Sequence, residues 1–66
     1  MMHYEGYVAI LELDEEGGFF HGEVVTARDV LTFQGRTPAA LRKAFKDTIE
    51  DYVAWCRARG KEPEKP

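Results

Sequence analysis

Three neighbouring carboxylates are the first residues of this chain that could do chemistry. Asp14, Glu15 and Glu16 stand directly before Gly17 and Gly18. Adjacent glycines supply the positive φ that a short hairpin loop needs, so we expect the acidic residues at the tip of a turn. Two interpretations stay open. Either the cluster contacts a basic protein surface, with Asp14 taking part directly, or it is an ordinary solvated turn.

His21 and Glu23 form a second pair with chemical potential, because imidazole and carboxylate together can transfer protons. On a strand, residues two apart share a face but lie about 7 Å from each other. That separation is too long for a direct hydrogen bond. We therefore interpret His21 as a surface residue of a half-exposed strand.

Composition removes most other chemistry. The chain has no Ser, and its single Cys56 cannot form an intrachain disulfide or a multi-cysteine zinc site. His3 and His21 do not have a metal-ligand spacing. A two-metal site needs carboxylates that converge from different elements, whereas Asp47 is expected on the solvent face of a helix. We expect no enzymatic activity, no metal and no cofactor.

The elements that position these residues follow from the hydropathy pattern. Alternation over residues 7–14, 19–25 and 30–34 predicts three strands, joined by turns at 14–18 and 26–29. The side chains expected to face the core are Tyr7, Ala9, Leu11, Leu13, Phe20, Val24, Leu31 and Phe33. Three consecutive strands with short turns predict an antiparallel β-meander.

The second half of the chain predicts one long helix over residues 38–59. Thr37 is an N-cap residue type, Pro38 suits the first helical position, and Gly60 is a natural terminator. An apolar stripe recurs at three- and four-residue spacing, at Leu41, Phe45, Thr48, Ile49, Tyr52 and Cys56. Cys56 is expected in the core, and Trp55 either covers the core or sheet edge or anchors an interface.

The predicted fold class is therefore α+β, a three-stranded antiparallel β-meander packed against one long C-terminal α-helix. Residues 1–60 form the domain, and residues 61–66 form an exposed tail of Pro and charged side chains. The outward face of the sheet is not uniformly polar, since Val8, Ile10, Val25 and Val30 share it with Glu12, His21, Glu23 and Thr32. An apolar patch or an unpaired edge strand invites a partner. We expect homo-oligomerisation or protein docking through this face or an edge.

Charge narrows the class of partner. The chain of 66 residues has a net charge of −3 and a pI near 5.3. Residues 1–34 hold one Arg against seven acidic residues, a net charge of −6, which leaves +3 for the rest. An acidic half suits a basic protein better than a nucleic acid. No apolar run approaches the roughly 18 residues of a membrane span, and no signal peptide opens the chain. We expect a cytoplasmic protein without membrane or nucleic-acid partners.

Several short motifs follow one another in a distinctive order. They are Gly6-Tyr7-Val8-Ala9, Phe20-His21-Gly22-Glu23-Val24, Asp29-Val30-Leu31-Thr32-Phe33-Gln34-Gly35, then Leu41, Phe45, Asp51-Tyr52, Cys56, Gly60 and Glu62-Pro63-Glu64-Lys65-Pro66. The series resembles the N-terminal domain of HicB-type antitoxins over essentially the whole chain. The resemblance implies a partial ribonuclease-H-like fold and an antitoxin that binds and silences HicA, a small basic toxin that cleaves mRNA.

The resemblance ends at the C-terminal tail, residues 61–66, which corresponds to an interdomain linker in the family. In longer relatives this linker leads to a further strand and a DNA-binding domain, so we expect no operator binding from residues 1–66. Whether the short C-terminus is natural or a truncation stays open. Two functions agree with these features: a module that neutralises a basic HicA-type toxin by direct binding, and an oligomeric assembly domain with no toxin partner.

Overall fold

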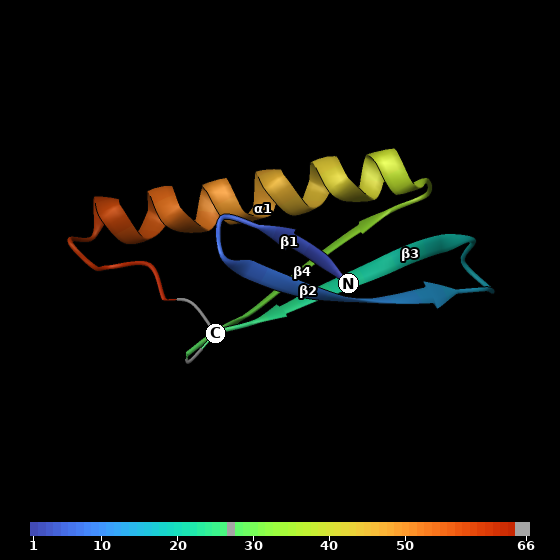
Figure 1. Ribbon diagram of the computed structural model, residues 1–66, viewed down its shortest axis with the longest axis horizontal. Coiled ribbons are helices and arrows are strands. Elements are labelled where there is room, and N and C mark those ends of the chain that lie inside the picture. Colours follow the sequence, from blue (N-terminus) through green and yellow to red (C-terminus); the bar gives the residue numbers. More distant parts are fainter. Residues whose placement is uncertain (27, 65–66) are drawn as a thin grey trace.

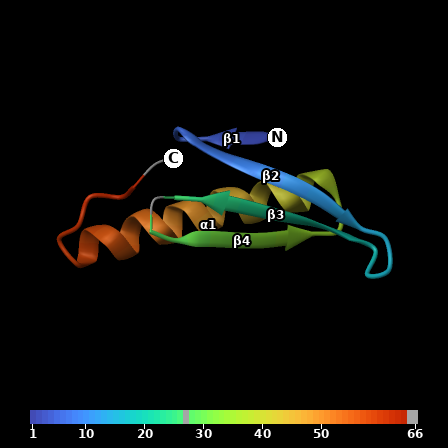
Figure 2. The ribbon, with the colours of Figure 1, turned by 90° about the horizontal axis from the view of Figure 1, so that it is seen from below.

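A single helix lies across one face of a four-stranded antiparallel sheet (Figures 1 and 2). The computed structural model describes residues 1–26 and 28–64. The elements are β1 (Met2–Tyr4), β2 (Tyr7–Asp14), β3 (Phe19–Val25), β4 (Val30–Gly35) and α1 (Pro38–Ala58), and the strand order is β1-β2-β3-β4. The α+β class is confirmed, and so is the long C-terminal helix. The strand number is corrected from three to four.

The additional strand is β1, which pairs with the start of β2. Tyr4 lies opposite Tyr7, and Met2 lies opposite Ala9. The two residues between the strands, Glu5 and Gly6, have φ values of 53° and 83°. Positive φ at both central residues is the requirement of a type I′ hairpin turn. Three residues are too few for a period-two pattern, so alternation could not predict this strand.

The β2–β3 hairpin has the predicted acidic turn. The Gly18 N–H donates to the Asp14 carbonyl over 2.9 Å, and the Gly17 N–H donates to Asp14 Oδ1 over 2.9 Å. Gly18 has a φ of 69°, so glycine is favoured there. The register that results places Asp14 opposite Phe19 and Ile10 opposite Glu23.

The helix begins and ends with the chemistry that the sequence predicts. Thr37 Oγ1 accepts a hydrogen bond from the Ala40 N–H over 3.0 Å, which caps the first turn. At the other end, the Lys61 N–H donates to the Cys56 carbonyl and the Gly60 N–H donates to the Arg57 carbonyl. These two bonds, with Gly60 at a φ of 68°, form a Schellman motif. The helix therefore ends at Ala58, one residue before the predicted end.

The core lies between this helix and the sheet. Its buried side chains are Tyr7, Ala9, Val24, Phe33, Leu41, Phe45, Ile49, Tyr52 and Cys56. The rings of Phe33 and Phe45 stack with centroids 5.1 Å apart, which joins β4 to the middle of α1. Tyr7 meets Tyr52 edge to face at 6.2 Å. The predicted helical stripe and the core position of Cys56 are confirmed.

Leu13, which is predicted on the core side, is exposed, and so is much of Trp55, for which the sequence leaves a covering role and an interface role open. Leu13 is 55% exposed, because it lies near the hairpin tip, which extends beyond the N-terminal end of α1 (Figure 1). Trp55 is 48% exposed and packs its ring under the Arg59 guanidinium at 4.1 Å. Alternation assigns a side chain to a face, but only the position of the helix decides whether that face is covered.

The C-terminal segment turns back onto the domain. Lys61 and Glu62 are exposed, but Pro63 and Glu64 are half-buried. The Glu64 N–H donates to Tyr52 Oη over 3.3 Å, and the Glu64 carboxylate pairs with Arg28 Nε at 2.8 Å. The expectation of an exposed tail therefore does not hold for Pro63 and Glu64. Lys65 and Pro66, and Ala27 in the predicted turn at 26–29, lie outside the described residues.

Candidate functional site

The sheet face that α1 leaves uncovered carries most of the predicted partner-binding residues. We call it the open face: the side chains of β2, β3 and β4 that point away from the helix. Its members are Val8, Ile10, Glu12, Phe19, His21, Glu23, Val25, Val30, Thr32 and Gln34. One helix can cover only one face of a sheet, so these side chains have no second layer above them within the described chain (Figure 2).

The strand register sets the neighbours on this face. Ile10 lies opposite Glu23, and Glu23 lies opposite Thr32 on its other side. Val25 lies opposite Val30. Ile10, Val25 and Val30 are 60%, 51% and 56% exposed, so more than half of each of these apolar side chains is accessible to solvent. The apolar side chains therefore extend from Ile10 toward the end of the open face away from the acidic turn, and Glu12 and Glu23 are the acidic neighbours of Ile10.

An acidic hollow lies at the hairpin end of the open face. It is lined by Glu12, Leu13, Asp14, Glu15, Glu16, Phe19, His21 and Gln34. The register explains the convergence, because Glu12 lies opposite His21 and Asp14 lies opposite Phe19. The turn residues and His21, which are separated in the sequence, thus belong to one concave surface.

The seven predicted contact residues fall into two adjoining groups. Val8, Ile10, His21 and Glu23 lie on the open face, while Asp14 ends β2 and Glu15 and Glu16 form the turn beside it. Sequence reasoning missed Glu12 and Phe19 as contributors to the hollow. The signal was present, because the hairpin at 14–18 fixes Glu12 opposite His21 once the loop length is known.

His21 has an acidic neighbour, but that neighbour is Glu12 across the strands and not Glu23 along the strand. Glu23 instead neighbours Ile10 and Thr32. Among the described residues, no three His, Cys, Asp or Glu side chains gather in a way that could hold a metal ion. The acidic hollow therefore offers negative charge and hydrogen-bond acceptors to a ligand.

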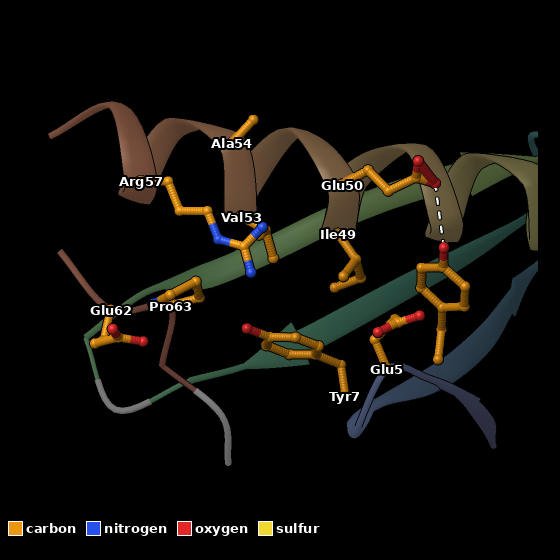
Figure 3. A pocket seen from close by; sticks show the side chains of 10 residues that line it. Glu5, Tyr7, Ile49, Glu50, Val53, Ala54, Arg57, Glu62 and Pro63 are labelled. Atoms are coloured by element: carbon orange, nitrogen blue, oxygen red, sulfur yellow. Dashed lines mark hydrogen bonds between the residues drawn. The ribbon is translucent and has the colours of Figure 1, made fainter. Parts of the chain in front are cut away.

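A second concavity of about 440 Å³ lies on the other side of the molecule (Figure 3). It is bounded by the β1–β2 turn, one flank of α1 and the C-terminal segment, and its lining comprises Tyr4, Glu5, Tyr7, Ile49, Glu50, Val53, Ala54, Arg57, Glu62 and Pro63. Arg57 projects from α1 into this groove, between Val53 and Pro63 (Figure 3). Three carboxylates (Glu5, Glu50 and Glu62) and one guanidinium (Arg57) line the groove, so its lining is acidic on balance.

Tyr4 contacts two charged side chains of α1 at this groove. Its hydroxyl donates to Glu50 Oε2 over 3.2 Å, and the Lys46 ammonium lies 5.6 Å from its ring centroid. Tyr4 therefore contacts both Lys46 and Glu50, two residues that lie four positions apart on the helix and could otherwise pair with each other. Partial burial raises the pKa of the Tyr4 hydroxyl above 10.0, and the Glu50 carboxylate raises it further.

Lys43 and Asp47 form an ion pair on the solvent face of α1, at 2.8 Å. Asp47 thus lies on the helix face away from the sheet, far from the acidic hollow on the open face. Within residues 1–26 and 28–64, no helix has both the length and the apolar character needed to cross a membrane.

No protein-family model, curated protein or solved structure matches this chain.

Proposed function

We propose that this domain is a protein-binding module of the antitoxin type, which neutralises a small basic HicA-type toxin by direct binding. The observation that carries the proposal is the combination of exposed apolar side chains and an acidic hollow on the one sheet face that no helix covers. An enzymatic role has less support, because the open face is an exposed sheet surface and not an enclosed pocket.

The composition of the open face suits such a partner. Apolar side chains at the centre of an interface supply most of the affinity, and a charged rim supplies orientation and association rate. Ile10, Val25 and Val30 provide the apolar part of the surface, and the acidic turn provides a charged rim at one end. A basic protein complements this rim, whereas nucleic acid would be repelled by it.

The experiment is a binding measurement with the product of a short basic reading frame next to this gene. Co-expression should restore growth that the toxin alone arrests, and the purified pair should form a complex. Ile10→Lys should weaken binding at least about tenfold, because it replaces an apolar contact of the interface with a charge that binding must desolvate. Reversal of Glu15 and Glu16 to Lys should mainly slow association and remove its salt dependence.

Asp47→Lys is the matched control, since it reverses an exposed carboxylate on the helix layer. It should leave binding within about twofold of wild type, because an exposed ion pair is worth little and lies far from the open face. Equal affinity of the Ile10→Lys and wild-type proteins would exclude the open face as the binding surface. A toxin that neither binds nor is neutralised would exclude the antitoxin function.

The second candidate function is an oligomeric assembly domain without a toxin. The observation that favours it is that β4 is an edge strand of the sheet, where a second copy of the chain could pair. Such pairing can be measured without any toxin.

A further inference from the structure

The two edges of the sheet are very different. β1 is only three residues long, and the helix flank beside it carries Arg42, Lys46, Glu50 and Arg57. A short edge strand next to charged side chains is a common protection against strand pairing. β4 is six residues long and contains neither Pro nor Lys. β4 is therefore the unprotected edge of this sheet.

The hydrogen-bonding pattern shows which backbone groups β4 leaves open. The Thr26 N–H donates to the Asp29 carbonyl over 2.9 Å, so these two residues are a hydrogen-bonded pair of the β3–β4 ladder. Such pairs alternate along an antiparallel ladder. Leu31, Phe33 and Gly35 therefore bond to β3, whereas Val30, Thr32 and Gln34 direct their N–H and C=O groups away from the sheet.

The helix flank beside β4 carries fewer charges than the flank beside β1. Ala44, Thr48, Asp51 and Trp55 follow this flank, with one charge among them. Asp51 and Trp55 line an apolar hollow together with Asp29, Leu31 and Tyr52. The exposed part of Trp55, 48% of the residue, therefore faces the β4 edge. Open backbone groups and accessible apolar side chains occur at the same edge.

We propose that a second copy of this chain pairs with this edge, through antiparallel β4–β4 pairing about a two-fold axis at Thr32. This register places Thr32 opposite Thr32 and Val30 opposite Gln34 of the second copy, so that all three open residues become hydrogen-bonded pairs. About six new backbone hydrogen bonds form. The pair extends the sheet through both molecules and leaves the open face of each uncovered.

The occupant is a second copy because the edge is complementary to itself. A two-fold axis brings the same patch of both molecules together. On the core side the register sets Leu31 opposite Phe33 of the second copy, and both are apolar. The same register places Arg28 opposite Arg36 and Asp29 opposite Gly35 of the second copy, and Asp29 and the Glu64 carboxylate, 2.8 Å from Arg28, supply the opposite charge there.

The helices fit this arrangement as well. Phe45 stacks on Phe33, and Tyr52 and Trp55 lie beside Leu31, so the helix lies nearest to the two-fold axis around Thr48. Antiparallel helices related by this axis place Trp55 beside the small Ala40 and Ala44 of the second copy. Helices approach to about 8–10 Å only where the side chains between them are small. Trp55 then becomes an anchor of the interface, consistent with the role of exposed Trp at such surfaces.

The test is the mass in solution by sedimentation, measured from micromolar concentration up to about 1 mM. The wild-type chain should sediment at twice 7.5 kDa. Thr32→Pro removes one outward N–H and leaves the β3–β4 ladder intact, and Ala44→Arg places a long charge on the helix flank. Each should sediment as a monomer, or need at least tenfold higher concentration to pair.

Matched controls separate the edge from other surfaces. Thr32→Val keeps the N–H, and Ala54→Arg adds the same charge on the exposed side of α1, so both should pair as wild type does. If Thr32→Pro fails to fold by circular dichroism, Ala44→Arg decides.

A monomeric wild type, or Thr32→Pro and Ala44→Arg proteins that pair normally, would overturn the proposal. The proposal would also be overturned if the Ile10→Lys protein no longer paired while the Thr32→Pro protein still did, because the interface would then be the open face. Toxin binding through the open face is a separate property, and its failure would leave this result unchanged.

Discussion

Gly22 sets how closely β3 can approach the aromatic centre of the core. A Cβ atom built on Gly22 would lie 2.2 Å from the Phe33 ring, well inside van der Waals contact. The ring cannot move away freely, because it stacks on Phe45 at 5.1 Å on the helix side. The absence of a side chain at position 22 is therefore what allows Phe33 to lie flat between sheet and helix.

Gly22→Ala should destabilise the domain by about 1–3 kcal/mol, the usual cost of an added carbon in a well-packed core. Urea unfolding followed by circular dichroism measures this change in the free energy of unfolding. Glu12→Ala, at an exposed position of β2, is the control and should change it by less than about 0.5 kcal/mol. A Gly22→Ala protein as stable as wild type would show that Phe33 has room to move.

The helix is the element whose limits are most completely explained by local chemistry. Thr37 caps the first turn through its hydroxyl, Pro38 follows at a position where its missing N–H costs nothing, and Gly60 closes the Schellman motif. Gly35 allows the strand to approach the helix, since a Cβ there would lie 2.6 Å from the Leu41 nitrogen. The sharp connection from β4 into α1 is thus built from three backbone requirements, at Gly35, Thr37 and Pro38.

Thr37→Ala should lower the free energy of unfolding by about 0.5–2 kcal/mol, because the Ala40 N–H loses its acceptor. For a domain of this size, 1 kcal/mol corresponds to roughly 4–8 °C in Tm. Thr37→Ser keeps the hydroxyl and should unfold near the wild-type temperature. If Ser is as destabilising as Ala, the methyl group of Thr37 and not its hydrogen bond is responsible.

At the scale of the whole molecule, one helix and one small sheet leave little margin of stability. A chain of this length buries only about 60% of its unfolded surface. The return of the C-terminal segment adds to the burial of Tyr52, through the Glu64 N–H bond of 3.3 Å. The uncovered face and the open edge are the two large surfaces available for further burial, and each suits a different partner.

Three groups make global stability sensitive to alkaline pH. Burial raises the pKa of the Tyr4 and Tyr7 hydroxyls above 10.0, and the hydrogen bond to Asp47 raises the pKa of Lys43 above 10.5. In each case the folded state binds the proton more tightly than the unfolded state. The stabilisation is therefore complete below pH 10 and is lost as the pH rises through the folded-state values.

The Tyr4→Phe variant checks this sign. It removes a titrating group together with the hydrogen bond to Glu50, so it should be less stable than wild type at about pH 8 but should lose less stability between about pH 10 and pH 11.5. Urea midpoints measured at these pH values give the comparison. An unchanged alkaline slope in Tyr4→Phe would assign the loss to Tyr7 and Lys43 instead.

The sequence by itself determined the helix, the three longer strands and the acidic turn. Each of these depends on local properties, such as the spacing of Leu41, Phe45 and Ile49, the cap at Thr37 and the glycines after Glu16. The same alternation assigned Ile10 and His21 to one face of the sheet, because side-chain direction on a strand has a period of two residues. The N-terminal strand was missed because its three residues are stabilised by pairing with Ala9 and its neighbours.

Only the tertiary structure decided which of these surfaces are covered. Leu13 is exposed because the hairpin extends beyond the helix, and Pro63 and Glu64 are half-buried because the chain turns back to Tyr52. The meeting of Glu12 with His21 and the open backbone groups of Thr32 likewise depend on register between strands. These features depend on which elements lie next to each other in space. The packing of the whole domain decides this, because a local sequence pattern holds no information about distant neighbours.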